Sequence, residues 1–169
     1  MKGNVLQWYA LYVKSRHEFA TEHELQKQGV VTYLPAIEKV RQWKDRKKYV
    51  NFPLFPGYIF VRIVANPEEY LKVLKIRGAV MLLSHRPGYP APIPSGEIES
   101  LRKLVESGEK IDIYPQLKEG ERIRIKRGPL KDAEGYLTKK ESQYVFIVNI
   151  ELLGRSIAVQ LYGEDLEVA

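Results

Sequence analysis

The chain has 169 residues, of which 44% are hydrophobic and 28% are charged, and it contains no cysteine. This composition predicts a folded protein of one ordinary domain or two small ones, and it excludes disulfides, thiolate metal sites and cysteine nucleophiles. The net charge of +6 is uneven, because residues 1–106 carry +7 and residues 107–169 carry −1. We therefore expect different partners for the two parts. No apolar run approaches the ~18 residues of a membrane span and Met1–Gln7 does not resemble a signal peptide, so we expect a cytoplasmic protein.

The first part of the chain begins with a strand and a helix. Val5–Val13 is rich in aromatic and aliphatic residues, which is typical of a buried strand. The run Ser15-Arg16-His17-Glu18 has the spacing of a capping box, so we predict a helix that begins at Arg16, reaches about Gln28 and is ended by Gly29. The next predicted elements are extended segments at Val30–Leu34 and Ile37–Val40, a hairpin with its polar tip at Lys44–Lys47, and a strand at Tyr58–Val64.

Two more helices are predicted from the residues at their starts. Asn66 can cap a helix and Pro67 suits its first position, so a helix should run from here to about Lys75. A second helix should begin at Ser95 and end before Gly108. Its apolar face comprises Ile98, Leu101, Leu104 and Val105. A short strand at Ala79–Leu83 and a proline-rich loop at Arg86–Pro94 separate the two helices.

The second part of the chain is predicted to be all β. Residues 108–118 lack periodicity, which indicates a linker. After Gly120 the pattern is one of short strands separated by glycine turns. The predicted strands are Arg122–Lys126, Tyr136–Lys139, Tyr144–Leu152, Ser156–Leu161 and Leu166–Val168. Such a series of short strands predicts a small barrel, since closure removes exposed edges.

The run Pro-Leu-Phe-Pro-Gly-Tyr at residues 53–58 is the most informative local motif. Its two prolines restrict the backbone, and Gly57 permits a tight turn into the following strand. Rigid aromatic side chains such as Phe55 and Tyr58 suit partner recognition, because little entropy is lost on docking. A core strand with a proline-rich entry is the alternative.

A second motif is basic. Six cations fall within ten residues, interrupted by Trp43 and Asp45 on the predicted hairpin. Such a hairpin could contact phosphates, with Trp43 available for stacking. A solvated hairpin whose lysines prevent edge-to-edge pairing is the alternative. The six cations are Lys39, Arg41, Lys44, Arg46, Lys47 and Lys48.

No catalytic, cofactor or metal site is predicted. His17 and His23 lie six residues apart on the first helix, so they point to different faces and do not form a metal-ligating pair. The third histidine is His85. No serine elbow, P-loop or dinucleotide fingerprint occurs in the sequence. We therefore expect a protein that is not an enzyme and that uses no cofactor.

Taken in order, the motifs resemble the NusG family of transcription elongation factors over essentially the whole chain. The resemblance implies an α+β fold, with an NGN-like domain at residues 1–107, a linker at 108–118 and an SH3-like KOW barrel at 119–169. The NGN-like motifs are Trp8-Tyr9, Ser15–Glu18, residues 53–58 and Pro90-Ala-Pro-Ile93. The KOW-like motifs are the Gly120-Glu-Arg-Ile-Arg-Ile run, Gly128-Pro129-Leu130, Gly135 and Leu152-Leu153-Gly154-Arg155.

The resemblance also implies partners. The first domain would dock on the clamp helices of the RNA polymerase β′ subunit, and the basic hairpin would lie near upstream or non-template DNA. The implied polymerase-binding residues are Trp8, Tyr9, Phe55, Pro56, Gly57 and Tyr58. The implied nucleic-acid-binding residues are Arg41, Lys44, Arg46, Lys47 and Lys48.

In the barrel, Leu130, Leu153 and Arg155 match positions that NusG proteins present to NusE (a small-subunit ribosomal protein) or to the termination factor Rho. Phenylalanine is typical at both apolar positions, so the two leucines weaken the expectation of an unchanged contact. Their alternative role is in the barrel core.

The resemblance favours a specialised paralog, of the RfaH, UpxY or LoaP kind, over a housekeeping NusG that couples to Rho and the ribosome. A monomer with no membrane partner is expected. The alternative from another class is an RNA-binding, ribosome-associated KOW protein. The net charge of −1 in the barrel part is unfavourable for phosphate binding, which disfavours this alternative.

Overall fold

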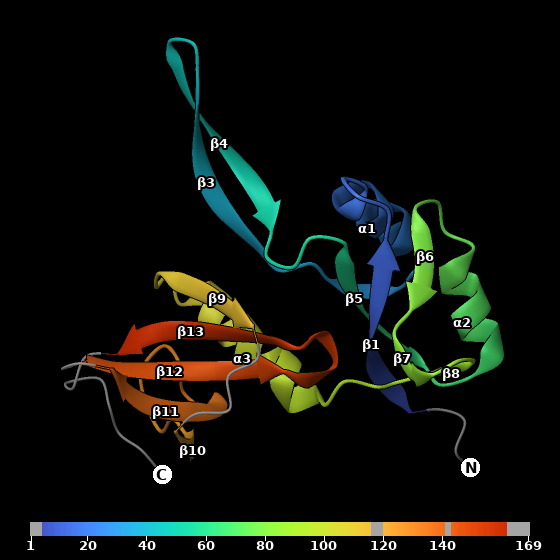
Figure 1. The fold of residues 1–169 in the computed structure, drawn as a ribbon. Coiled ribbons are helices and arrows are strands. Elements are labelled where there is room, and N and C mark those ends of the chain that lie inside the picture. The colour runs from blue at the N-terminus through green and yellow to red at the C-terminus, as the bar shows by residue number, and fades with distance from the viewer. Residues whose placement is uncertain (1–4, 116–119, 141–142, 162–169) are drawn as a thin grey trace. The chain divides into compact units, whose positions relative to one another are not determined.

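The computed structural model describes residues 5–115, 120–140 and 143–161, and it confirms the predicted α+β class (Figure 1). Its sheets are antiparallel throughout these residues. The chain divides into two units, Met1–Pro92 and Ile93–Ala169, which are considered separately below. None of the helices in the described part of the chain has the length and apolarity that crossing a membrane requires.

The first unit contains two helices and eight strands among its described residues. In chain order these are β1 (Leu6–Val13), α1 (Glu18–Lys27), β2 (Val31–Tyr33), β3 (Ala36–Trp43), β4 (Arg46–Pro53), β5 (Tyr58–Val64), α2 (Pro67–Leu74), β6 (Ala79–Leu82), β7 (Ser84–Arg86) and β8 (Tyr89–Pro90). Strands β2, β5, β1 and β6 form one sheet in that order, whereas β3 pairs with β4 and β7 with β8.

One face of the four-stranded sheet forms the core of the first unit. Alternate residues of β1 and β5 point to this face, as the two-residue period of a strand requires. Helices α1 and α2 both contribute to the same core, through Leu25 and Val73 respectively. The buried strand residues are Tyr9, Leu11 and Val13 of β1, Ile59, Val61 and Ile63 of β5, and Leu82 of β6. The opposite face of the sheet is only partly covered, because Trp8 and Phe60 are buried there while Tyr12 is exposed.

The start of α2 confirms the sequence prediction. Asn66 has extended backbone geometry and its Oδ1 accepts a hydrogen bond of 2.9 Å from the Glu69 backbone N–H. Pro67 occupies the first helical position, where its missing N–H leaves no donor unsatisfied. The local residues alone account for this boundary.

We expect the substitution Asn66→Ala to lower the free energy of unfolding by about 1 kcal/mol, because it removes this capping hydrogen bond. Urea unfolding followed by tryptophan fluorescence would measure the change. Asn66→Asp keeps a capping oxygen and should be close to neutral. An equal loss for both substitutions would show that the cap contributes nothing specific.

The start of α1 differs from its prediction. The helix begins at Glu18 rather than Arg16, and its N-cap residue His17 makes no side-chain capping bond. Arg16 takes a positive φ of 65°, and the Glu18 carboxylate accepts a hydrogen bond from the Arg16 backbone N–H at 3.0 Å. The Lys14 backbone N–H donates to the carbonyl of Gly78, so a long-range contact sets this turn instead of a capping box.

The second unit is a five-stranded antiparallel sheet with one helix among its described residues. Its elements are α3 (Ser95–Glu106), β9 (Ile111–Pro115), β10 (Glu121–Arg124), β11 (Glu134–Lys140), β12 (Gln143–Ile150), a 3₁₀ turn (Glu151–Leu153) and β13 (Arg155–Leu161). The strand order is β10-β11-β12-β13-β9, which is consistent with the predicted KOW barrel. The predicted strand Leu166–Val168 lies outside the described residues. Part of the predicted linker forms β9, which pairs with β13.

Helix α3 packs within the second unit, against β11 and β12. Its buried face consists of Ile98, Leu101 and Leu104. The hydroxyl of Ser100, which is also buried, accepts a hydrogen bond of 2.9 Å from the Glu134 backbone N–H. The sequence predicted the helix and its apolar face but placed it in the first domain, because an apolar stripe does not specify the surface that covers it. The functional boundary at residue 107 remains a prediction.

Candidate interaction surfaces

The β3–β4 hairpin extends away from the sheet of its own unit (Figure 1). The two strands pair from Ala36 opposite Pro53 to Trp43 opposite Arg46, and Lys44 in the turn has a positive φ of 48°. The indole of Trp43 is 71% exposed near the tip. All five cations predicted to bind nucleic acid are exposed on this hairpin: Arg41, Lys44, Arg46, Lys47 and Lys48. The structure thus brings this predicted set together.

A pair of tyrosines lies where β1 and β5 meet, on the sheet face opposite the core. Tyr12 is directly opposite Tyr58, and their ring centroids are 5.5 Å apart. Tyr12 is 40% exposed and Tyr58 is half-buried. Gly57 has a φ of 90° and its carbonyl accepts a hydrogen bond from the Val13 backbone N–H, so the loop at residues 53–58 is tied to β1. The backbone of the loop is thereby fixed beside the tyrosine pair.

The other residues predicted to bind polymerase are placed less favourably. Trp8, Tyr9 and Phe55 are buried. The ring of Phe55 lies edge-on to the ring of Phe60, with centroids 6.2 Å apart. Pro56 is exposed and Gly57 is buried beside Tyr12. Tyr58 is therefore the one aromatic member of the predicted set with substantial exposure.

Tyr12 was missed by the sequence analysis, although a signal for it existed. Tyr12 and Trp8 are four residues apart in one strand, so they point to the same face of the sheet. To place Tyr12 opposite Tyr58, the sequence would also have had to indicate that β1 and β5 pair, and in which register. The residue types alone do not supply that register.

Tyr9 belongs to the core of the first unit. Its hydroxyl lies 3.2 Å from the hydroxyl of Tyr70 and donates a hydrogen bond to Gln7 Oε1 at 3.1 Å. Burial, reinforced by the contact with Tyr70, raises the pKa of Tyr9 well above its ordinary value. The phenol is thus held neutral and inward, which gives Tyr9 a structural role in this conformation.

The three barrel residues predicted to bind a partner are not equivalent. Leu130 is buried and joins the core of the second unit. Leu153 is half-buried in the 3₁₀ turn, and Arg155 is exposed at the start of β13. Gly154 between them takes a left-handed conformation with a φ of 60°. The turn from Leu153 to Arg155 is therefore the accessible part of the predicted set.

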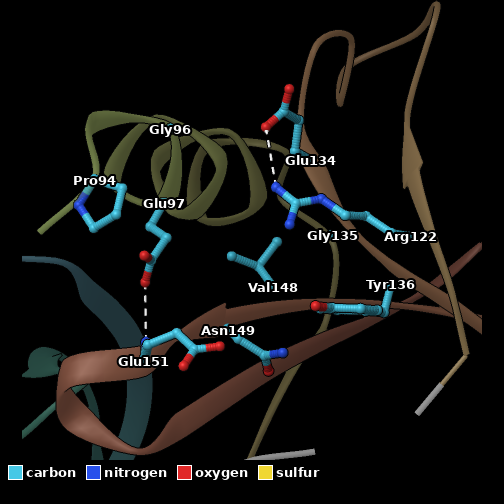
Figure 2. Close-up of a pocket in the computed structure, with 10 residues that line it drawn as sticks. All are labelled: Pro94, Gly96, Glu97, Arg122, Glu134, Gly135, Tyr136, Val148, Asn149 and Glu151. Carbon is cyan, nitrogen blue, oxygen red and sulfur yellow. Dashed lines mark hydrogen bonds and ion pairs between the residues drawn. The ribbon is translucent and has the colours of Figure 1, made fainter. Parts of the chain in front are cut away.

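A cavity of about 240 Å³ lies within the second unit, beside the start of α3 (Figure 2). The Glu97 carboxylate at its edge accepts a hydrogen bond of 2.9 Å from the Glu151 backbone N–H. Burial raises the pKa of Glu97, and this hydrogen bond opposes the rise. Glu134 on another edge pairs with Arg122 and Arg124, at 3.9 Å and 3.6 Å. Glu97 thus links α3 to the turn after β12, whereas the Glu134 carboxylate links β11 to β10.

The described residues contain no group of three or more acidic or histidine side chains arranged to hold a metal ion. The features that stand out are instead a cationic hairpin, an exposed tyrosine pair and an accessible barrel turn. These surfaces lie on an α+β unit and on a five-stranded antiparallel sheet unit that is consistent with a small barrel.

Comparisons with known proteins identify the family. The model of the family described as "Transcription termination factor nusG" matches residues 6–102. The chain is 26% identical to the transcription termination/antitermination protein NusG of Borreliella burgdorferi, over 95% of this chain and 97% of that protein. It is also 26% identical to the NusG of Pasteurella multocida, over 95% and 94% of the respective chains.

A solved structure supports the fold. The structure titled "Domain interaction in Thermotoga maritima NusG" matches with a TM-score of 0.52 and 22% identity, covering 95% of this chain and 96% of that one. The chain belongs to the NusG family, whose members are transcription termination and antitermination factors rather than enzymes.

Proposed function

We propose that this chain is a transcription elongation and antitermination factor that binds RNA polymerase through its first unit. The observation that carries the proposal is the partly exposed Tyr12–Tyr58 pair, held by the loop at residues 53–58. Rigid aromatic anchors on an apolar sheet face suit a helix-in-groove contact, in which a few residues supply most of the binding energy. The clamp helices of the β′ subunit are the partner that family membership indicates.

The proposed mechanism is non-enzymatic. A factor that binds the closed, processive polymerase more tightly than the paused one shifts the population toward elongation. The cationic hairpin would contact upstream or non-template DNA. The barrel would bring a second partner to a high effective concentration near the polymerase. Because such a factor acts on transcribing polymerase, we continue to expect a cytoplasmic protein.

The barrel would bind its partner through the turn that contains Leu153 and Arg155. The absence of phenylalanine at Leu130 and Leu153 favours a specialised paralog over a housekeeping NusG, because two aromatic contacts to NusE or Rho are missing. Comparing pausing with Rho-dependent termination in vitro separates the two. A specialised antiterminator should suppress pausing without stimulating Rho, whereas a housekeeping factor should stimulate Rho-dependent termination.

The proposal is tested by retention of RNA polymerase on the immobilised full chain. We expect Tyr58→Ala to weaken binding by about 2 kcal/mol or more, which is a roughly 30-fold rise in Kd. Tyr49→Ala is the matched control, since Tyr49 is 66% exposed but lies on the hairpin, away from the pair. It should retain wild-type affinity.

No retention of polymerase by the wild-type chain would reject the proposed function. Equal losses for Tyr58→Ala and Tyr49→Ala would reject the tyrosine pair as the anchor. Circular dichroism of each variant would confirm that the variants compared are folded.

A further inference from the structure

The cavity beside the start of α3 is lined by a buried hydrogen-bond donor that has no partner. Asn149 is 7% exposed and lies on β12, directly opposite the buried Ser156 of β13. The Ser156 hydroxyl donates a hydrogen bond to Asn149 Oδ1. The amide nitrogen, Nδ2, therefore points away from Ser156, and it makes no hydrogen bond within the part of the chain that the structure describes. Because buried polar groups are almost always hydrogen-bonded, Nδ2 indicates an acceptor that belongs to a ligand or to water.

The cavity is larger than a single bridging water requires. Its volume of about 240 Å³ compares with about 30 Å³ for one water molecule in the liquid. Tyr136 and Asn149 both line it, and Figure 2 shows the Asn149 amide on the side to which the Tyr136 hydroxyl points. The cavity therefore has room for a small ring system that brings the missing acceptor to Nδ2.

The edge of the cavity next to α3 offers hydrogen-bond acceptors. The Glu97 carboxylate accepts a hydrogen bond of 2.9 Å from the Glu151 backbone N–H. A carboxylate has about four lone-pair sites on its two oxygens, so Glu97 can accept further bonds. Burial raises the pKa of Glu97, so additional N–H donors would stabilise its ionised form. A ligand that suits this cavity combines an acceptor for Asn149 with N–H donors for Glu97.

Another edge of the cavity carries positive charge. Arg122 lines the cavity, and both Arg122 and Arg124 approach the single carboxylate of Glu134, at 3.9 Å and 3.6 Å. Two guanidinium groups share one carboxylate, so a net positive charge remains at this edge. Both arginine side chains are more than half exposed. Guanidinium groups in such a position are suited to phosphate.

We propose that this cavity binds a guanine nucleotide. The Watson–Crick edge of guanine presents the O6 acceptor beside the N1–H and N2 amino donors, and proteins read single bases through this edge. Asn149 Nδ2 donates to O6, the Glu97 carboxylate accepts from the N–H groups, and Arg122 contacts a phosphate. The half-buried ring of Tyr136 offers an aromatic face for stacking. Adenine places an amino donor where guanine has O6, so it would leave Asn149 unpaired.

Two sources supply this chemistry, a free nucleotide and an unpaired guanosine in RNA. Binding of fluorescently labelled GDP to the purified full chain tests both, and it requires no polymerase. Unlabelled GDP should compete at least tenfold better than ADP, because a site built to hydrogen-bond one group discriminates against a ligand that lacks it. A short RNA with one unpaired guanosine is compared with the same RNA carrying adenosine at that position. Stronger competition by GDP than by the guanosine RNA assigns the site to a free nucleotide, and the reverse assigns it to RNA.

The proposal is overturned by a lack of saturable binding of both GDP and the guanosine RNA. Equal competition by the guanine and adenine forms of each ligand also overturns it. In either case the cavity is a site for water, and Asn149 Nδ2 is satisfied by that water.

Glu97→Gln tests the contact with the base. Glutamine keeps an oxygen for the Glu151 backbone N–H, but it presents an amide donor in place of a second acceptor. GDP binding should weaken about tenfold or more, as expected for the loss of a hydrogen bond to a charged group. Glu99→Gln is the matched control, because Glu99 is exposed on the same helix and the change in charge is equal. It should bind GDP as the wild type does, and equal losses for the two variants reject the assignment of Glu97.

Asn149→Asp tests the buried donor. Aspartate keeps an oxygen for the Ser156 hydroxyl but removes the N–H group that faces the cavity. We expect the GDP affinity to fall more than tenfold, and thermal unfolding followed by circular dichroism establishes whether the variant is folded. A folded Asn149→Asp variant with wild-type affinity overturns the proposal. If the variant does not fold, Glu97→Gln decides, since glutamine retains the hydrogen bond that joins α3 to the turn after β12.

Discussion

Gly135→Ala is expected to unfold the barrel unit, with a loss of at least about 4 kcal/mol in its free energy of unfolding. A Cβ atom at this position would overlap the backbone carbonyl of Ile147 and lie 3.0 Å from the ring of Phe146. The Ile147 backbone belongs to β12, which pairs with β11 through Tyr136 opposite Ile147. The clash therefore cannot be relieved by a side-chain rotation, and the ladder between the two strands must open.

The full chain offers separate signals for its two units. Both tryptophans, Trp8 and Trp43, lie in the first unit, and Trp8 is buried there. When Gly135→Ala is unfolded in urea, the curve followed by far-UV circular dichroism should lack the unfolding step of the barrel unit. Tryptophan fluorescence should keep the transition of the first unit.

Gly96→Ala is the control in the same unit. A Cβ atom there would meet only the Glu134 carboxylate, at an ordinary contact distance of 3.8 Å. Because Gly96 lies in α3, alanine should stabilise the unit by about 0.5 to 1 kcal/mol. Equal destabilisation by the two substitutions would contradict the steric explanation for Gly135.

The sequence predicts those elements whose signals are local. The start of α2 depends on Asn66 and Pro67, which act within one turn, and the structure reproduces it. The strand Tyr58–Val64 was predicted with its observed bounds, because its β-branched and aromatic residues directly follow a rigid turn. In both cases no distant contact is needed to choose the conformation.

Elements that depend on distant contacts were predicted less well. The start of α1 is set by a backbone contact to Gly78, not by the capping-box pattern of its own residues. Strand β9 forms in a segment without periodicity because β13 offers it a partner. The apolar face of α3 was predicted correctly, but the sequence did not specify the strands that it packs against, since Ile98 and Leu101 fit any apolar surface of suitable shape.

The candidate surfaces follow the same rule. The sequence predicted that the hairpin cations lie together, because side chains that are close in the sequence stay close on an exposed hairpin. The aromatic set was predicted only in part, because residue type does not reveal which face of a strand is covered. Trp8 and Tyr9 point to opposite faces of β1 and are nevertheless both buried. On the second face of β1 and β5, the aromatic side chains with exposed area are Tyr12 and Tyr58, whereas Trp8 and Phe60 are buried.

Phe55 and Tyr58 should therefore respond differently to the same substitution. Phe55 is 4% exposed and packs against Phe60, so Phe55→Ala should lower the free energy of unfolding by about 3 kcal/mol or more. Tyr58→Ala removes a half-buried ring and should cost clearly less stability while losing polymerase affinity. Urea unfolding monitored by tryptophan fluorescence, combined with the polymerase retention assay, measures both quantities for each variant.

Phe55→Leu is the matched control for Phe55. It keeps an apolar side chain of similar volume, so it should lose less than about 1.5 kcal/mol and retain polymerase as the wild type does. This result would mean that Phe55 holds the loop in place through its buried contact with Phe60, while Tyr58 contacts the polymerase. The opposite pattern, with unchanged unfolding of Phe55→Ala but lost polymerase retention, would mean that the Phe55 ring leaves the core on docking. The sequence-based assignment of Phe55 as a direct contact would then hold, and the tyrosine pair would be only part of the surface.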